Sequence, residues 1–183
     1  CALSGVGLEF GKTNKDKYSF DLPDSVSKKD HDLVLKEFSV TATENILMFA
    51  SALPRKTNIR LAATEPHIQD LARFLVKMGA DIEGIGTHYL TVNGKSNLFG
   101  AKHQIVPDYI EAGTFLIAIA ATRGEATVKN IIPDHIEAIL YKLDEMGVKF
   151  QIKKKKDGFA DITVYPSKKM TATRIQTLPF PGL

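Results

Sequence analysis

Hydroxyl and carboxylate side chains gather where a strand is predicted to run into a helix. Ser39, Thr41 and Thr43 lie at one such junction, where free backbone amides and the helix dipole favour an anion or a hydrogen-bond acceptor. Glu44 follows Thr41 at capping-box spacing, and its carboxylate would oppose an anion placed very close. The pattern indicates either a binding site for a polar ligand or simple helix capping, and both readings stay open.

A second junction of the same kind occurs later in the chain. Asp108 precedes an apolar run, and Glu111 stands three residues after it, which is again capping-box spacing. An acidic cap beside Tyr109 would prefer a hydroxyl or a cation as ligand. Plain helix capping is the alternative.

Two short runs place a carboxylate and a histidine at a predicted helix start, namely Glu65-Pro66-His67 and Pro133-Asp134-His135. A general acid–base pair is conceivable, but capping explains the same pattern because proline fits the first helical turn. Five scattered histidines and one cysteine do not form a metal-binding pattern. The lysine run 153–156 fits a solvated turn better than a phosphate or nucleic-acid site.

These residues would be positioned by a compact βαβαββ unit that is used twice, over residues 33–100 and 102–166. Met78-Gly79 and Met146-Gly147 end corresponding helices, and Gly124 is expected to supply a left-handed stop after the helix that Asp108 begins. A short strand should lead into Asp108. The other predicted strands are 58–62, 81–85 and 89–92 in the first copy, and 127–130, 149–152 and 161–164 in the second.

The ends of the chain resemble parts of further copies. Residues 5–10 and 18–22 read as paired strands joined by a polar turn over 11–17, and residues 173–177 read as the start of another strand. We therefore expect the chain to begin inside a preceding copy and to lack structure at both ends.

Composition limits the class of protein only loosely. The 183 residues include 24 basic and 21 acidic side chains, an excess that neither requires nor excludes nucleic acid. The single cysteine cannot form an internal disulfide, which favours a reducing compartment. No apolar run reaches the roughly 18 residues of a membrane span.

Several runs resemble the UDP-N-acetylglucosamine 1-carboxyvinyltransferases. Residues 38–48 resemble that family's Ser-Val-Gly-Ala-Thr-Glu-Asn segment, and residues 107–115 resemble its Pro-Asp-Arg-Ile-Glu-Ala-Gly-Thr-Phe. Residues 65–71 and 84–87 are also similar to the family, and 177–182 resemble the run before its Pro-Thr-Asp. The resemblance covers about residues 33–183.

The resemblance implies an α/β (α+β) fold of enolpyruvyl transferase-like βαβαββ repeats, with helices packed on mixed sheets in two lobes. Residues 1–106 would be part of the UDP-sugar-binding lobe and residues 107–183 part of the second lobe. The implied reaction transfers the enolpyruvyl group of phosphoenolpyruvate to the 3-hydroxyl of UDP-N-acetylglucosamine, the first committed step of peptidoglycan synthesis. No metal or organic cofactor is implied.

The family's functional residues carry over only in part. Cys1 resembles the cysteine that donates a proton, while Thr41 replaces a glycine and Tyr109 replaces an arginine. Glu37 stands where some members have a lysine. The substrate-binding residues expected on this basis are Glu37, Ser39, Val40, Thr41, Glu65, Asp108 and Tyr109.

Partners and activity follow from the same resemblance. UDP-N-acetylglucosamine and phosphoenolpyruvate are the expected small-molecule partners, in the cytoplasm, without nucleic acid or membrane. The chain alone is expected to be inactive, to lack the remainder of its own fold and to be open to self-association through apolar patches. A non-catalytic UDP-sugar-binding or structural relative is one alternative. A different enolpyruvyl transferase, such as the shikimate-pathway enzyme, or an RNA-cyclase relative is the other.

Overall fold

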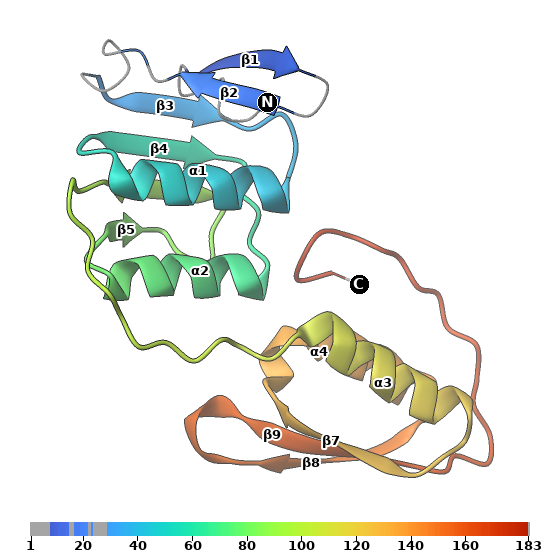
Figure 1. The fold of residues 1–183 in the computed structure, drawn as a ribbon. Helices are drawn as coiled ribbons and strands as arrows, with labels where there is room; N and C mark the ends of the chain where they lie inside the picture. The colour runs from blue at the N-terminus through green and yellow to red at the C-terminus, as the bar shows by residue number, and fades with distance from the viewer. Residues whose placement is uncertain (1–7, 15–16, 22, 24–28, 183) are drawn as a thin grey trace. The chain divides into compact units, whose positions relative to one another are not determined.

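The computed structural model describes residues 8–14, 17–21, 23 and 29–182. The chain divides into two compact units, Cys1–Gln104 and Ile105–Leu183, which we call unit 1 and unit 2. Each unit places helices against a sheet (Figure 1). The predicted mixed α/β fold is thereby confirmed.

Unit 1 is built around a four-stranded sheet with the order β3-β4-β6-β5. Strands β3 and β4 are parallel, and the other neighbours are antiparallel. Helices α1 and α2 lie on the same face of this sheet (Figure 1), and their apolar sides form one core with the buried strand residues. The elements are β3 (His31–Val34), α1 (Val40–Ala52), β4 (Lys56–Arg60), α2 (Pro66–Lys77), β5 (Asp81–Glu83) and β6 (Tyr89–Asn93).

A separate antiparallel hairpin precedes the sheet. Its strands are β1 (Glu9–Asn14) and β2 (Lys17–Asp21). The pairing was predicted, but the turn was placed too early, because Gly11 lies inside β1 opposite Ser19. Residues 5–7 and 22 of the predicted strands lie outside the described residues.

Unit 2 contains a three-stranded antiparallel sheet with the order β7-β9-β8. Helix α3 packs against β7 and β9, and a second apolar core joins the helices to the sheet. The elements are α3 (Tyr109–Ala121), β7 (Ala126–Ile131), the 3₁₀ turn η2 (Pro133–His135), α4 (Glu137–Glu145), β8 (Lys149–Lys154), the 3₁₀ turn η3 (Lys156–Gly158) and β9 (Ala160–Tyr165).

The two units repeat one pattern, as the sequence predicts. In each sheet the last strand of the unit lies between the two that precede it. The helix stops also correspond, because Gly79 and Gly147 have positive φ values of 104° and 78°. In both, the N–H of the residue after the glycine donates a hydrogen bond to a carbonyl oxygen near the end of the helix. Ala80 donates to Leu75, and Val148 donates to Leu143.

The predicted first strand of the second repeat is wrong. Residues 100–108 contain no strand, so the unit predicted over 102–166 lacks the partner that β3 provides for β4. Two features explain this. His103 is held by α2 of unit 1, and Pro107 has no N–H to give to a sheet. The strand predicted over 173–177 is also absent, and none of the described strands pairs with that segment.

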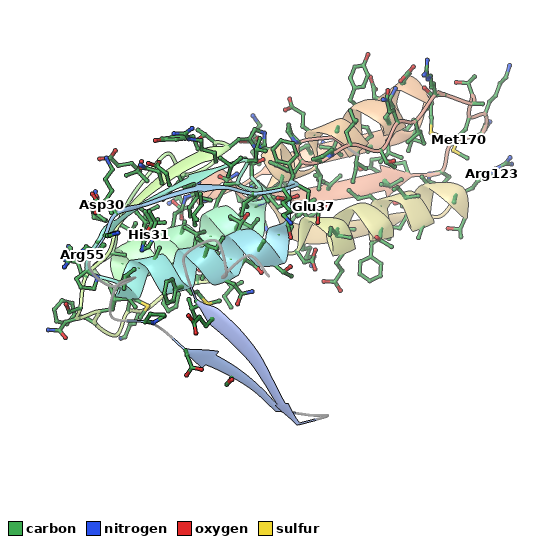
Figure 2. The ribbon with its side chains drawn as sticks, turned by 90° about the horizontal axis from the view of Figure 1, so that it is seen from above. Asp30, His31, Glu37, Arg55, Arg123 and Met170 are labelled. Carbon is green, nitrogen blue, oxygen red and sulfur yellow. The ribbon has the colours of Figure 1, made fainter. Side chains whose placement is uncertain are left out.

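Three local boundaries differ from the prediction. The residue in the left-handed conformation after α3 is Arg123, with φ 54°, and not Gly124; Arg123 lies beyond the end of α3 (Figure 2). The helix predicted from Pro133 is divided into η2 and α4. Strand β4 begins two residues earlier than predicted, because its register with β6 starts at Lys56.

Gly147→Ala is expected to destabilise unit 2 by about 1–2 kcal/mol, the usual cost of a left-handed conformation for an L-residue. The side chain itself has room, since an added Cβ would meet only the Lys169 carbonyl oxygen, at 3.7 Å. Gly124→Ala is the matched control and should leave stability unchanged or raise it by up to about 1 kcal/mol. Urea unfolding of both variants checks this, and equal losses would contradict the assignment.

Candidate functional site

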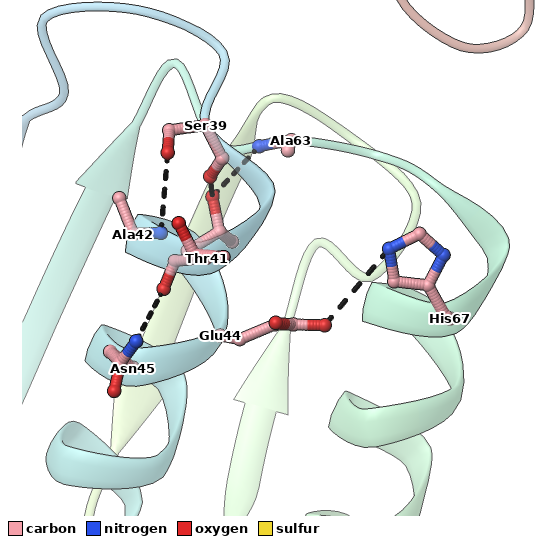
Figure 3. A network of polar contacts seen from close by, with 8 residues as sticks. Ser39, Thr41, Ala42, Glu44, Asn45, Ala63 and His67 are labelled. Carbon is pink, nitrogen blue, oxygen red and sulfur yellow. Dashed lines mark hydrogen bonds and ion pairs between the residues drawn. The ribbon is translucent and has the colours of Figure 1, made fainter.

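The first turn of α1 is capped by Ser39. Its Oγ accepts a hydrogen bond from the Ala42 N–H at 3.3 Å, which makes Ser39 the N-cap in place of the predicted Thr41. Thr41 is exposed, and its carbonyl oxygen accepts from Asn45 Nδ2 at 2.7 Å (Figure 3). The Thr41 hydroxyl therefore lies on the surface of the first turn and does not cap the helix.

Thr43 links this helix start to a second chain segment. Its side chain is fully buried, and its hydroxyl donates to the Ser39 carbonyl oxygen at 2.8 Å. The Thr43 hydroxyl oxygen also accepts a hydrogen bond from the Ala63 N–H at 3.0 Å (Figure 3). Because Ala63 lies in the loop between β4 and α2, one hydroxyl fixes the N-terminal ends of α1 and α2 beside each other.

The start of α2 adds ionisable groups to this end of unit 1. Glu65 precedes Pro66 at the N-cap position, and its side chain makes no capping hydrogen bond. Its Oε2 is buried and has no hydrogen-bond partner within the described part of the chain. A buried carboxylate oxygen without a donor is costly, which makes Glu65 suited to accept a hydrogen bond from a ligand.

The predicted acid–base pair at this position has a different arrangement. His67 Nε2 lies 4.0 Å from Glu44 Oε1, so the histidine faces the carboxylate of the neighbouring helix (Figure 3). This ion pair is a second link between α1 and α2. It places Glu44 opposite an imidazole, where it balances a positive charge when His67 is protonated.

Sequence reasoning missed the part that His88 takes in this region. His88 Nδ1 lies 2.7 Å from the Ala62 carbonyl oxygen, which can only accept, so Nδ1 carries the proton. The imidazole also lies against the Phe38 ring, with centroids 4.5 Å apart. No spacing pattern indicates this contact, because it depends on how the β5–β6 turn folds over the loop after β4.

The predicted residues of unit 2 form a helix start of their own. Asp108 is the N-cap of α3, as predicted, and its Oδ1 accepts from the N–H groups of Ile110 at 2.8 Å and Glu111 at 3.1 Å. The Tyr109 ring packs edge-on against Phe180, with a centroid distance of 5.6 Å. The contacts of Asp108 show capping, and they leave its second carboxylate oxygen for other partners.

Asp108→Ala is expected to destabilise unit 2 by about 1 kcal/mol, because two amides of the first turn lose their acceptor. Asn is an equally good N-cap, so Asp108→Asn is the matched control and should retain most of the stability. For a unit of this size the alanine variant should melt about 4–8 °C lower. Thermal unfolding measures both, and an asparagine variant as unstable as the alanine variant would contradict a capping role.

The structure thus gathers only some of the predicted site residues. Ser39, Val40, Thr41 and Glu65 lie at the shared N-terminal end of α1 and α2. Glu37 is exposed and precedes the Ser39 N-cap by two residues, so it lies at this end of unit 1, away from Asp30, His31 and Arg55 (Figure 2). Cys1 lies outside the described residues.

Unit 2 holds the other predicted acid–base pair. Asp134 and His135 line a cleft of about 450 Å³ between η2, α4 and the segment 176–182. Tyr141 and Phe180 add aromatic surface to it. The cleft contains none of the residues predicted to bind substrate.

Only half of the lysine run lies in the predicted turn, because Lys153 and Lys154 are strand residues that pair with β9. Lys155 Nζ lies 2.5 Å from Asp161 Oδ1 and 2.8 Å from Asn130 Oδ1. The hydrogen bond from Lys155, followed by that of the Asn130 N–H, holds the pKa of Asp161 below its ordinary value. One of the four amines is therefore already used, which supports the structural reading of this run.

The described residues were also compared with the requirements of a metal site and of a membrane-spanning helix. Within residues 8–14, 17–21, 23 and 29–182, no group of three or more His, Cys, Asp or Glu is placed to hold a metal ion. None of the helices in these ranges is both long and apolar enough to cross a membrane.

Comparison with known proteins identifies the family. A family model described as EPSP synthase (3-phosphoshikimate 1-carboxyvinyltransferase) matches residues 11–183. The chain belongs to the EPSP synthase family. Relatives in this family include the UDP-N-acetylglucosamine 1-carboxyvinyltransferase of Fervidobacterium nodosum, which is 44% identical over the whole chain. A second enzyme of that name, from Caldanaerobacter subterraneus, is 47% identical over 79% of the chain.

Two solved structures have the same fold. The enolpyruvyl transferase NikO of Streptomyces tendae superposes with a TM-score of 0.76 at 16% identity, over all of this chain and 44% of its own. The EPSP synthase of Acinetobacter baumannii gives 0.65 at 20% identity, over 97% of this chain and 40% of its own. The chain spans 44% of the Fervidobacterium protein and 34% of the Caldanaerobacter protein.

Proposed function

We propose that this chain is part of a UDP-N-acetylglucosamine 1-carboxyvinyltransferase. The protein would transfer the enolpyruvyl group of phosphoenolpyruvate to the 3-hydroxyl of UDP-N-acetylglucosamine and release phosphate. The main support is the 44% identity over the whole chain to an enzyme of that name, against 20% to a solved EPSP synthase. We therefore choose UDP-N-acetylglucosamine as the acceptor substrate, after the relatives with the higher sequence identity.

Unit 1 supplies the proposed UDP-sugar surface, and unit 2 would belong to the second lobe. Ser39 caps α1, and Val40 and Thr41 begin its first turn. Backbone amides without a partner inside the helix, together with the exposed Thr41 hydroxyl, suit the polar edge of a uridine. Glu65 offers its buried oxygen to a hydroxyl or amide donor. Asp108 and Tyr109 would contribute from unit 2, Glu37 from the segment before α1, and Cys1 would supply the proton to the enolpyruvyl methylene carbon.

A non-catalytic relative that still binds a UDP-sugar is the second candidate. Two departures from the family pattern favour it, since Glu37 stands where some members have a lysine and Tyr109 stands where the family usually has an arginine. Loss of two cations would weaken the stabilisation of phosphate charge on which such a transfer depends.

The proposal is tested with the longer protein that contains this chain. We expect phosphate release with phosphoenolpyruvate and UDP-N-acetylglucosamine, and none when shikimate 3-phosphate replaces the sugar nucleotide. Release with shikimate 3-phosphate alone would overturn the substrate assignment. Binding of UDP-N-acetylglucosamine without release would establish the non-catalytic relative instead.

Location and assembly belong to the same proposal. The reaction uses soluble intracellular metabolites, so we place the protein in the cytoplasm. The isolated chain should show no turnover, because the relatives that it matches are more than twice as long. Exposed apolar side chains on α3, including Ile110, Phe115 and Ile117, would then face the remainder of the fold or a second copy.

A further inference from the structure

Residues 94–103, which we call the belt, run back along α2 after β6 without forming a helix or strand. The belt is attached at its start, where the Lys95 N–H donates to the Ser51 carbonyl oxygen at 3.0 Å. Leu98 packs against the core of unit 1. The Phe99 N–H then donates to the Met78 carbonyl oxygen at 2.8 Å, so the belt passes over the C-terminal end of α2.

The far end of the belt is closed by His103. Its Nε2 lies 2.9 Å from Asp70 Oδ1, and both side chains are only 10% exposed. Its Nδ1 lies 3.2 Å from Lys77 Nζ, and its ring lies 5.2 Å from that of Phe74. Asp70, Phe74 and Lys77 are spaced by about one turn each, so a single face of α2 holds the imidazole on three sides.

The partners fix which ring nitrogen carries the proton. A carboxylate accepts hydrogen bonds, so His103 Nε2 donates to Asp70. An ammonium group can only donate, so His103 Nδ1 must accept from Lys77 and carries no hydrogen. A neutral imidazole with its proton on Nε2 satisfies both contacts, and the charges of Lys77 and Asp70 stand at its two ends.

We propose that His103 is the clasp of this belt and fixes the point at which the chain leaves unit 1. The clasp holds the backbone of the belt's last residues against α2, although the neighbouring side chains of Lys102 and Gln104 are exposed. It also explains why the apolar run after it does not pair as the predicted strand. This conformational device is independent of the proposed substrate.

Limited trypsin digestion tests the clasp, because the bond after Lys102 lies directly beside it. Cleavage of a folded protein reports how often the site opens. His103→Ala removes two hydrogen bonds to charged groups and should speed cleavage after Lys102 by about tenfold or more. Lys77→Met removes one exposed partner and should give a smaller increase in the same direction. Gln104→Ala is the matched control, and cleavage after Lys154 in unit 2 is the internal reference.

Two results would overturn the proposal. One is a Lys102 cleavage rate that stays within about twofold of the wild type in both clasp variants. The other is an equal rise in cleavage after Arg73, inside α2, since a clasp that fixes only the path of the belt leaves that helix folded. Nitrogen-15 NMR of His103 gives an independent readout, in which the wild type should show the Nε2–H tautomer.

Discussion

Thr43→Val is expected to lower the free energy of unfolding of unit 1 by about 2 kcal/mol. The substitution keeps the shape of a fully buried side chain but removes the hydroxyl that accepts from the Ala63 N–H and donates to the Ser39 carbonyl oxygen. A buried amide left without an acceptor costs about 1–3 kcal/mol. Hydrogen exchange of the most protected α1 amides measures the loss.

Thr57→Val is the matched control for this prediction. Thr57 is equally buried, but its Oγ1 has no hydrogen-bond partner among the described residues. Replacing an unsatisfied buried hydroxyl with a methyl group should therefore leave stability unchanged or raise it. If both variants lost the same free energy, the Thr43 bridge would not be the link between the two helix starts.

Leu116→Ala is expected to destabilise unit 2 by about 3 kcal/mol. Leu116 is completely buried on α3, within the core that this helix shares with α4 and the sheet. Truncating a buried leucine removes apolar contact and leaves a cavity, at a usual cost of about 2–5 kcal/mol. Denaturant unfolding followed through the unit 2 amides gives the value.

The neighbouring residue on the same helix provides the control. Ile117 is about half exposed, so Ile117→Ala removes little buried surface and should cost less than about 1 kcal/mol. A larger loss at Ile117 than at Leu116 would mean that the opposite side of α3 faces the core, which would contradict the packing described for unit 2.

Features set by short segments could be predicted from the sequence. The stops at Gly79 and Gly147 were recognised because a glycine after an apolar helical run suits a left-handed residue. The Asp108 cap was recognised for a similar reason, since its partners lie two and three residues away. The repeat was predicted from these glycines and caps. The strand order confirms it for the last three strands of each unit, but not for the first strand of the second copy.

Features that depend on distant partners were missed. Thr41 and Ser39 are both residue types that cap helices. The hydrogen bond that the distant Ala63 N–H donates to the Thr43 hydroxyl stabilises the start observed at Ser39. The run before Asp108 is β-branched and apolar, yet the clasp at His103 and the missing N–H of Pro107 keep it out of a sheet.

The candidate site could be predicted only in part, for the same reason. Ser39 and Thr41 were singled out by their place at a predicted helix start. The contacts of His88 with Ala62 and Phe38, and the pairing of His67 with Glu44, arise between elements that are distant in sequence. Such contacts cannot be predicted from residue type and spacing.

The shared N-terminal end of α1 and α2 is the proposed binding surface for the UDP-sugar. Amide NMR spectra of this chain, titrated with UDP-N-acetylglucosamine and separately with shikimate 3-phosphate, test this assignment. We expect weak binding of the sugar nucleotide, with shifts concentrated at Ser39–Thr43 and Ala63–Glu65, and none from shikimate 3-phosphate. Shifts at those amides from shikimate 3-phosphate alone, or sugar-nucleotide shifts confined to unit 2, would contradict the claim.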